Sequence, residues 1–141
     1  MNKNTFKSGN VSFQYLDTWI VEKADTFNNP DCIATLSKGE NNLLNVVAFP
    51  TPTNLDDYKE FMENTISDDG GVILESDFVQ IASMDAIRLH ANIKSPDITF
   101  DIHTYVFIEG GSIYIFELRT ADYSSATINE YDDLISSLKL E

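Results

Sequence analysis

The sequence predicts an α+β fold in which two helices pack on a mostly antiparallel β-sheet. Short runs rich in β-branched and aromatic residues recur along most of the chain, separated by Gly, Pro, Asn and Asp. Apolar residues occur at helical spacing in two segments, one after Pro52 and one near the end of the chain. No repeat or linker divides this order, so we expect residues 1–141 to form a single domain.

The first part of the chain is expected to contribute short strands. Trp19 is expected to anchor the core, because a large aromatic ring buries much apolar area. A loop is predicted from Asp25 to Asp31, where Asn and Pro are concentrated. Pro50 and Pro52 are expected to end this part of the sheet. The strands are predicted over residues 11–15, 19–23, 32–37 and 43–49.

The first helix is predicted to begin after Thr53 or Asn54, either of which can cap it. Asp56 and Asp57 then lie in its first turn, where the helix dipole favours negative charge. The helix is expected to end at the Asp-Asp-Gly-Gly segment 68–71. Its predicted apolar face consists of Leu55, Tyr58, Phe61, Met62 and Ile66.

The second helix is predicted near the end of the chain. Thr127 and Glu130 have the spacing of a capping box, which predicts that the helix begins there. Its predicted apolar stripe consists of Ile128, Tyr131, Leu134, Ile135 and Leu138. Each stripe is interpreted as core, because a helix of this length needs a buried face to be stable.

Between the helices, a strand over residues 72–81 leads into a meander of three more strands. The turns are predicted at Lys94–Asp97 and at Glu109–Gly111. Side chains alternate between the two faces of a strand. Along residues 98–108, one face should therefore carry Ile98, Phe100, Ile102, Thr104, Val106 and Ile108, and the other Thr99, Asp101, His103, Tyr105 and Phe107. We expect the first set to receive a helix and the second to stay polar.

Assumed hairpin registers bring the polar side chains of the meander together. If Ile93 faces Ile98, then His90 faces Asp101 and Arg88 faces His103. If Ile108 faces Ser112 across a three-residue loop, Asp101 faces Arg119 and His103 faces Glu117. This inference is conditional, because a slip of one residue moves a side chain to the other face. The candidate binding face therefore consists of Arg88, His90, Asp101, His103, Tyr105, Glu117 and Arg119.

Two functional interpretations of this face remain open beside a purely structural one. The imidazoles of His90 and His103, with the carboxylate of Asp101, are groups that hold a divalent ion such as zinc. Arg88 and Arg119 disfavour a metal in the same patch, so no metal or cofactor is assigned. Arg and Tyr are enriched at binding hot spots, so a docking surface for a protein is the better functional hypothesis.

Composition limits the classes of function. The formal charge of −14 disfavours nucleic acid and anionic lipid as partners, because both are themselves negative. Cys32 is the sole cysteine, which excludes an intramolecular disulfide and predicts a small buried side chain. No serine-hydrolase elbow, zinc-protease motif or P-loop is present. We therefore expect no catalytic residues, and a monomeric, non-enzymatic accessory or protein-binding domain.

The sequence contains no apolar run long enough to cross a membrane and no evident export signal, so direct membrane insertion is not expected. The compartment stays open, because a signal could have been trimmed before Met1.

Two local motifs resemble the PsbP-like family. One is Phe-x-Tyr-x-x-x-Trp, here Phe13 to Trp19, with Leu16 where the family usually has Pro after the Tyr. The other is the closing hairpin from Tyr105 to Tyr114, together with the final helix, which ends in Leu138 where the family often ends in Ser-Phe.

This resemblance implies an α-β-α sandwich. The family contains extrinsic subunits of the oxygen-evolving photosystem and prokaryotic relatives that are often exported or lipid-anchored. It implies an accessory or binding role and an extracytoplasmic location if the start was trimmed. It supplies no common catalytic residues.

Overall fold

The computed structural model describes residues 3–22, 30–94, 97, 99–121 and 124–140. Its elements are β1 (Lys3–Ser8), β2 (Val11–Leu16), β3 (Ile20–Glu22), β4 (Cys32–Lys38), β5 (Asn42–Pro50), α1 (Leu55–Asp68), β6 (Val72–Ile81), β7 (Met84–Lys94), β8 (Thr99–Glu109), β9 (Ser112–Thr120), α2 (Ser125–Ser136) and β10 (Lys139–Leu140).

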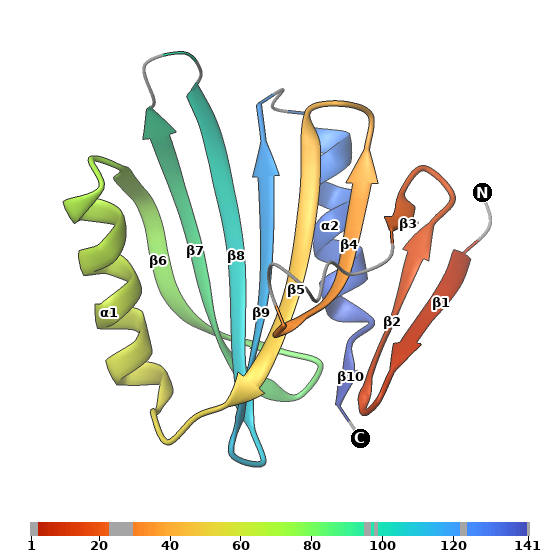
Figure 1. Cartoon of the computed structure of the whole chain (residues 1–141), viewed down its shortest axis with the longest axis horizontal. Coiled ribbons are helices and arrows are strands. Elements are labelled where there is room, and N and C mark those ends of the chain that lie inside the picture. Colours follow the sequence, from red (N-terminus) through yellow and green to blue (C-terminus); the bar gives the residue numbers. More distant parts are fainter. Residues whose placement is uncertain (1–2, 23–29, 95–96, 98, 122–123, 141) are drawn as a thin grey trace.

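The strands form two antiparallel sheets (Figure 1). The larger sheet has the order β3-β4-β5-β9-β8-β7-β6, and the smaller has the order β1-β2-β10. The two helices lie on opposite sides of the larger sheet: α1 contacts β6, β7 and β8, whereas α2 lies behind β9, β5 and β4 and contacts β2. The α+β fold and its layered arrangement are therefore confirmed.

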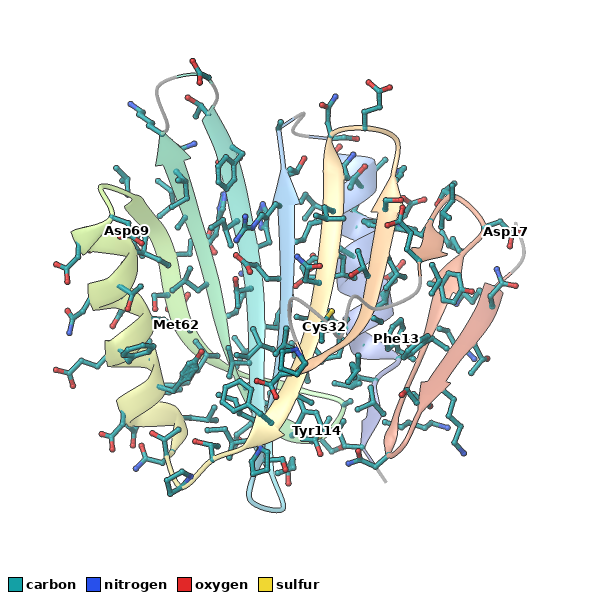
Figure 2. All side chains as sticks on the ribbon, viewed as in Figure 1. Phe13, Asp17, Cys32, Met62, Asp69 and Tyr114 are labelled. Carbon is teal, nitrogen blue, oxygen red and sulfur yellow. The ribbon has the colours of Figure 1, made fainter. Side chains whose placement is uncertain are left out.

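The main core fills the space between the larger sheet, α2 and the smaller sheet. We call this side of the larger sheet the α2 face; among its buried residues are Leu36, Leu44, Tyr105, Phe107, Phe116 and Leu118. Phe13 of the smaller sheet reaches this core (Figure 2). Its ring meets that of Phe116 edge-on at a centroid distance of 5.9 Å. Trp19 is buried in the same core, as its size predicts.

The opposite side, which we call the α1 face, carries a smaller cluster centred on Ile87, Val106 and Ile113. Leu55, Tyr58 and Met62 of α1 pack against this cluster. Met62 lies on the side of α1 that faces the sheet (Figure 2). Both faces of the β7–β9 meander therefore carry a helix. The expectation that one side stays polar and open is wrong, because Tyr105 and Phe107 of that side belong to the main core.

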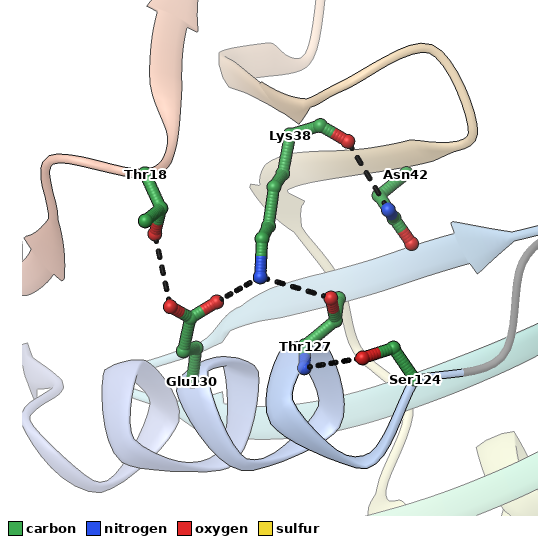
Figure 3. A network of polar contacts seen from close by, with 6 residues as sticks. All are labelled: Thr18, Lys38, Asn42, Ser124, Thr127 and Glu130. Carbon is green, nitrogen blue, oxygen red and sulfur yellow. Dashed lines mark hydrogen bonds and ion pairs between the residues drawn. The ribbon is translucent and has the colours of Figure 1, made fainter.

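Polar contacts fix the start of α2 and attach it to the sheet (Figure 3). Ser124 is the N-cap, and its side chain accepts a hydrogen bond from the backbone N–H of Thr127. The predicted capping box at Thr127 is therefore wrong: Thr127 is buried in the first turn and its hydroxyl accepts a hydrogen bond from Lys38 at 3.0 Å. Glu130 instead forms an ion pair with Lys38 and accepts a hydrogen bond from Thr18.

Most of the predicted element boundaries hold within one or two residues. Asn54 is the N-cap of α1, where it accepts a hydrogen bond from the N–H of Asp57, and Cys32 is buried. The first and last strands were not predicted; β10 returns the chain to the smaller sheet by pairing with β2. The loop expected at 25–31 lies largely outside the described residues. Neither described helix is long and apolar enough to cross a bilayer.

Candidate functional sites: a histidine cluster and an apolar groove

The two histidines of the chain lie side by side on the α2 face. His90 of β7 is directly opposite His103 of β8. Their rings stack with centroids 4.0 Å apart and with planes inclined by 18°. The predicted pairing of His90 with Asp101 is therefore wrong by two residues.

The cause is the register of the β7–β8 hairpin. Ile93 pairs with Phe100, so the predicted registration is displaced by two residues. The predicted turn at Lys94–Asp97 lies partly outside the described residues. Because a displacement of two residues preserves the faces, His90, Asp101 and His103 still share one side of the sheet, as predicted.

Asp101 completes a cluster with the two histidines. Its backbone partner across β7 is Asn92, whose amide donates a hydrogen bond of 2.9 Å to Oδ1 of Asp101. The other carboxylate oxygen, Oδ2, lies 3.8 Å from Nε2 of His90. One potential ligand atom from each of His90, Asp101 and His103 falls within 4.8 Å of the others. We call these three residues the histidine cluster.

One nitrogen of each imidazole in the cluster, Nε2, is buried and has no hydrogen-bond partner among the described residues. His103 is only 8% exposed. Burial, reinforced by the neighbouring His90, lowers the pKa of His103 to about 4, although Asp101 acts in the opposite direction. His103 is therefore a neutral imidazole at neutral pH.

Arg88 and Tyr105, the next pair along β7 and β8, are held by partners of their own. Arg88 forms an ion pair with Glu75 of β6 at 3.1 Å. Tyr105 is buried and its hydroxyl donates a hydrogen bond of 2.9 Å to Asp132 of α2. Burial and this contact raise the pKa of Tyr105 above its ordinary value. Tyr105 is therefore part of the contact between sheet and helix.

Glu117 and Arg119 lie on the α1 face, not with the histidines. Glu117 pairs with Thr104, and Arg119 pairs with Ile102. The predicted placement is wrong because Gly110 and Gly111 form a two-residue turn instead of part of a three-residue loop. Both glycines have positive φ, 58° and 81°, which a type I′ hairpin turn requires. Because the loop is one residue shorter than predicted, both charged side chains lie on the opposite face of the sheet from the predicted one.

The predicted binding face is thus divided between two surfaces. Arg88, His90, Asp101, His103 and Tyr105 remain on the α2 face. On the α1 face, Arg119 donates a hydrogen bond to Glu117 at 3.3 Å, and its guanidinium lies 5.8 Å from the centre of the Phe100 ring.

An apolar groove separates α1 from β5 and β9 on the α1 face. Its wider part has a volume of about 510 Å³ and is lined by Phe49, Thr51, Thr53, Asp57, Tyr58, Phe61 and Ile113. A narrower extension of about 260 Å³ shares Tyr58 and Phe61 and continues past Met62 and Ile115 to Glu117. Burial and the nearby charge of Glu117 raise the pKa of Tyr58, which therefore stays neutral at neutral pH.

Phe61 is predicted to belong to the apolar face of α1, but its ring is 62% exposed in the structure. The spacing of the apolar residues in the helix already indicated that Phe61 lies off the buried face. Leu55, Tyr58, Met62 and Ile66 follow one another at intervals of three or four residues, whereas Phe61 precedes Met62 by one and so lies about 100° around the helix. That rotation turns Phe61 from the sheet toward the groove.

Comparison with known proteins shows likeness in fold. No protein-family model matches the sequence, and no curated protein matches it. The solution structure of cyanobacterial PsbP (CyanoP) from Synechocystis sp. PCC 6803 is similar, with a TM-score of 0.74 and 15% identity over 99% of this chain and 92% of that one.

Two further structures are similar at lower identity. A protein from Bacteroides thetaiotaomicron VPI-5482 has a TM-score of 0.70 at 14% identity, covering all of this chain and 49% of its own. LpqN, a protein involved in cell envelope biogenesis of Mycobacterium tuberculosis, has a TM-score of 0.61 at 11% identity, covering 98% of this chain and 91% of its own. The architecture and these neighbours together show that the chain has the PsbP-like fold, as its two sequence motifs predict.

Proposed function

We propose that this chain is a non-enzymatic accessory domain that binds a protein partner in the apolar groove beside α1. The observation that carries the proposal is the groove itself, with the exposed ring of Phe61 on its wall. An accessory role is also in keeping with the similarity in fold to PsbP and LpqN.

The packing of α1 supports this proposal, because the helix leaves apolar side chains beside the groove incompletely buried. A surface helix of a globular protein usually buries one apolar stripe. None of the residues of α1 is fully buried, and the groove lies between this helix and the residues Phe49 of β5 and Ile113 of β9. Exposed apolar side chains gathered in a hollow are typical of an interaction site.

The charges around the groove favour a basic partner. Asp57 lines its wider part, and Glu117, which is paired with Arg119, lines its narrower part. The chain as a whole has 23 acidic and 9 basic residues. We therefore assign as occupant a segment of a protein that packs an apolar anchor against the contacting rings of Tyr58 and Phe61 and presents Lys or Arg to the rim.

The proposal includes no catalytic step. A hydrolytic nucleophile needs a base within hydrogen-bonding distance. Among the described residues, neither histidine Nε2 bonds a hydroxyl or thiol, and the thiol of Cys32 is buried and directed at the carbonyl of Ala34.

Affinity capture with matched variants tests the proposal. We would use the wild type, Phe61→Ser and Phe78→Ser as baits for a lysate of the source organism, followed by quantitative mass spectrometry. Phe78 is the control because it is 54% exposed and lies on β6, away from the groove. Both substitutions are at exposed positions, so both baits should stay folded.

The expected result is a protein that the wild type and Phe78→Ser retain and that Phe61→Ser loses by about tenfold or more, as expected for an anchor residue. Its retention should also weaken as salt is raised, because salt screens the acidic rim. Equal recovery by all three baits, or loss with Phe78→Ser alone, contradicts the assignment to the groove.

A further inference from the structure

We propose that the histidine cluster, formed by His90, Asp101 and His103, is a binding site for a divalent transition-metal ion of the zinc type. This inference goes beyond the protein-binding function and does not depend on it, because the cluster and the groove lie on opposite faces of the sheet.

The first argument is the state of the imidazole nitrogens. Buried polar atoms in folded proteins almost always have a hydrogen-bond partner, and an unpaired one costs about 1–3 kcal/mol. Here two such atoms, Nε2 of His90 and Nε2 of His103, occur side by side without a partner among the described residues. A cation bound at the edge of the two rings, once they turn toward it, gives both nitrogens a partner.

The second argument is the orientation of the carboxylate. Asn92 donates a hydrogen bond to Oδ1 of Asp101, which leaves Oδ2 directed toward His90 at 3.8 Å from its Nε2. Metal-binding carboxylates are commonly held in this way by a second residue that fixes the ring or carboxyl plane. Asn92 is thus a positioning residue for the proposed site.

The third argument is the donor set. Two imidazole nitrogens and one carboxylate oxygen suit Zn²⁺ and neighbouring transition metals better than Ca²⁺ or Mg²⁺, which prefer oxygen ligands. Bonds of about 2.0–2.1 Å place tetrahedral ligand atoms about 3.3 Å apart. The donor atoms lie within 4.8 Å of one another, so the side chains must bring them about 1–1.5 Å closer together when the ion binds.

The fourth argument concerns charge. Arg88 is the nearby cation that repels a metal, and its guanidinium is paired with Glu75 on the outer strand β6, which offsets its positive charge.

The number of ligands is a separate point. Three protein ligands leave one coordination position for water or for a group from another molecule.

Zinc titration with matched variants tests this proposal. Isothermal titration of the metal-free protein with ZnCl₂, in excess magnesium to occupy the acidic surface, should give one strong site per chain. Asn92→Ala should weaken that site by about 10–100-fold, and Asp101→Asn and His90→Gln, which remove ligands, by at least as much. Asp85→Asn removes a carboxylate at the opposite end of β7 and should leave the affinity unchanged.

Nuclear magnetic resonance of the wild type gives a readout that does not depend on any variant. The imidazole ¹⁵N resonances of both histidines should shift together to zinc-bound positions at one equivalent. If zinc leaves both imidazoles unshifted, or if Asp101→Asn binds as tightly as the wild type, the cluster is a polar contact within the sheet and the proposal is wrong.

Discussion

Tyr131 is the residue through which α2 is joined most directly to the central strands. Its side chain is fully buried, and its hydroxyl lies 2.9 Å from two carbonyl oxygens, those of His103 on β8 and Phe116 on β9. One hydroxyl proton serves one carbonyl at a time, so the two strands share a single donor. Burial raises the pKa of Tyr131 well above its ordinary value, which keeps this donor protonated.

Replacing Tyr131 with Phe should therefore destabilise the protein by about 1–2 kcal/mol, because the ring is retained while a buried carbonyl loses its donor. Urea unfolding of the wild type and the variant measures the difference. Tyr15→Phe is a suitable control, since that side chain is only partly buried and its loss should cost about 0.5 kcal/mol or less. Equal effects of the two substitutions would contradict the bridging role.

His103 makes stability depend on pH in a direction that its burial determines. Its pKa in the folded protein, about 4, is below the ordinary histidine value of 6.5. Between these values the unfolded chain binds a proton that the folded chain does not, so stability falls as the pH falls. In chelator-treated protein, the loss due to His103 from about pH 7 to about pH 5 should be about 2 kcal/mol.

The comparison with His103→Gln isolates this contribution from that of the carboxylates. Unfolding free energies of the two proteins should converge as the solution is acidified, because the variant lacks the group that resists protonation. Parallel curves would mean that His103 takes up its proton as readily in the folded as in the unfolded chain.

At the scale of elements, the ion pair between Lys38 and Glu130 holds α2 against β4. Both side chains are largely buried, at 24% and 15% exposed, and Thr18 and Thr127 supply further hydrogen bonds (Figure 3). Removing one partner of such a pair leaves the other partly buried without its counter-charge.

Glu130→Ala should therefore lower the free energy of unfolding by about 1–3 kcal/mol. Glu63→Ala removes one member of the Lys59–Glu63 pair, four residues apart within α1, and should cost only about 0.3–0.5 kcal/mol. Chemical denaturation of both variants provides the comparison. A loss for Glu130→Ala no larger than that for Glu63→Ala would show that the pair contributes little to docking of α2.

Features of the strands and helices that depend on local sequence could be predicted, whereas those that depend on turn length or tertiary contacts could not. Alternation along β8 separated the two faces correctly, because the period of a strand is a local property. The position of Glu117 and Arg119 depended on whether the Gly110-Gly111 loop has two residues or three, and both lengths are common in hairpins. Ser124 caps α2, whereas the Thr127 hydroxyl and Glu130 are engaged by Lys38, a contact that depends on the tertiary fold.

At the scale of the whole molecule, the larger sheet presents two different surfaces. The α2 face carries the main core and the partly buried histidine cluster, whereas the α1 face carries an apolar groove with acidic residues at its rim. The similarity in fold to cyanobacterial PsbP does not indicate which of the two surfaces binds a partner. The division between them follows from the β8–β9 register, which assigns each side chain of the two strands to its face.

Cross-strand nuclear Overhauser contacts between β8 and β9 test this division most directly. The account predicts backbone contacts between Thr104 and Glu117 and between His103 and Leu118, the directly opposed pairs of the structure. Contacts that pair His103 with Glu117 and Asp101 with Arg119 would return the charged side chains to the histidine face and contradict the account.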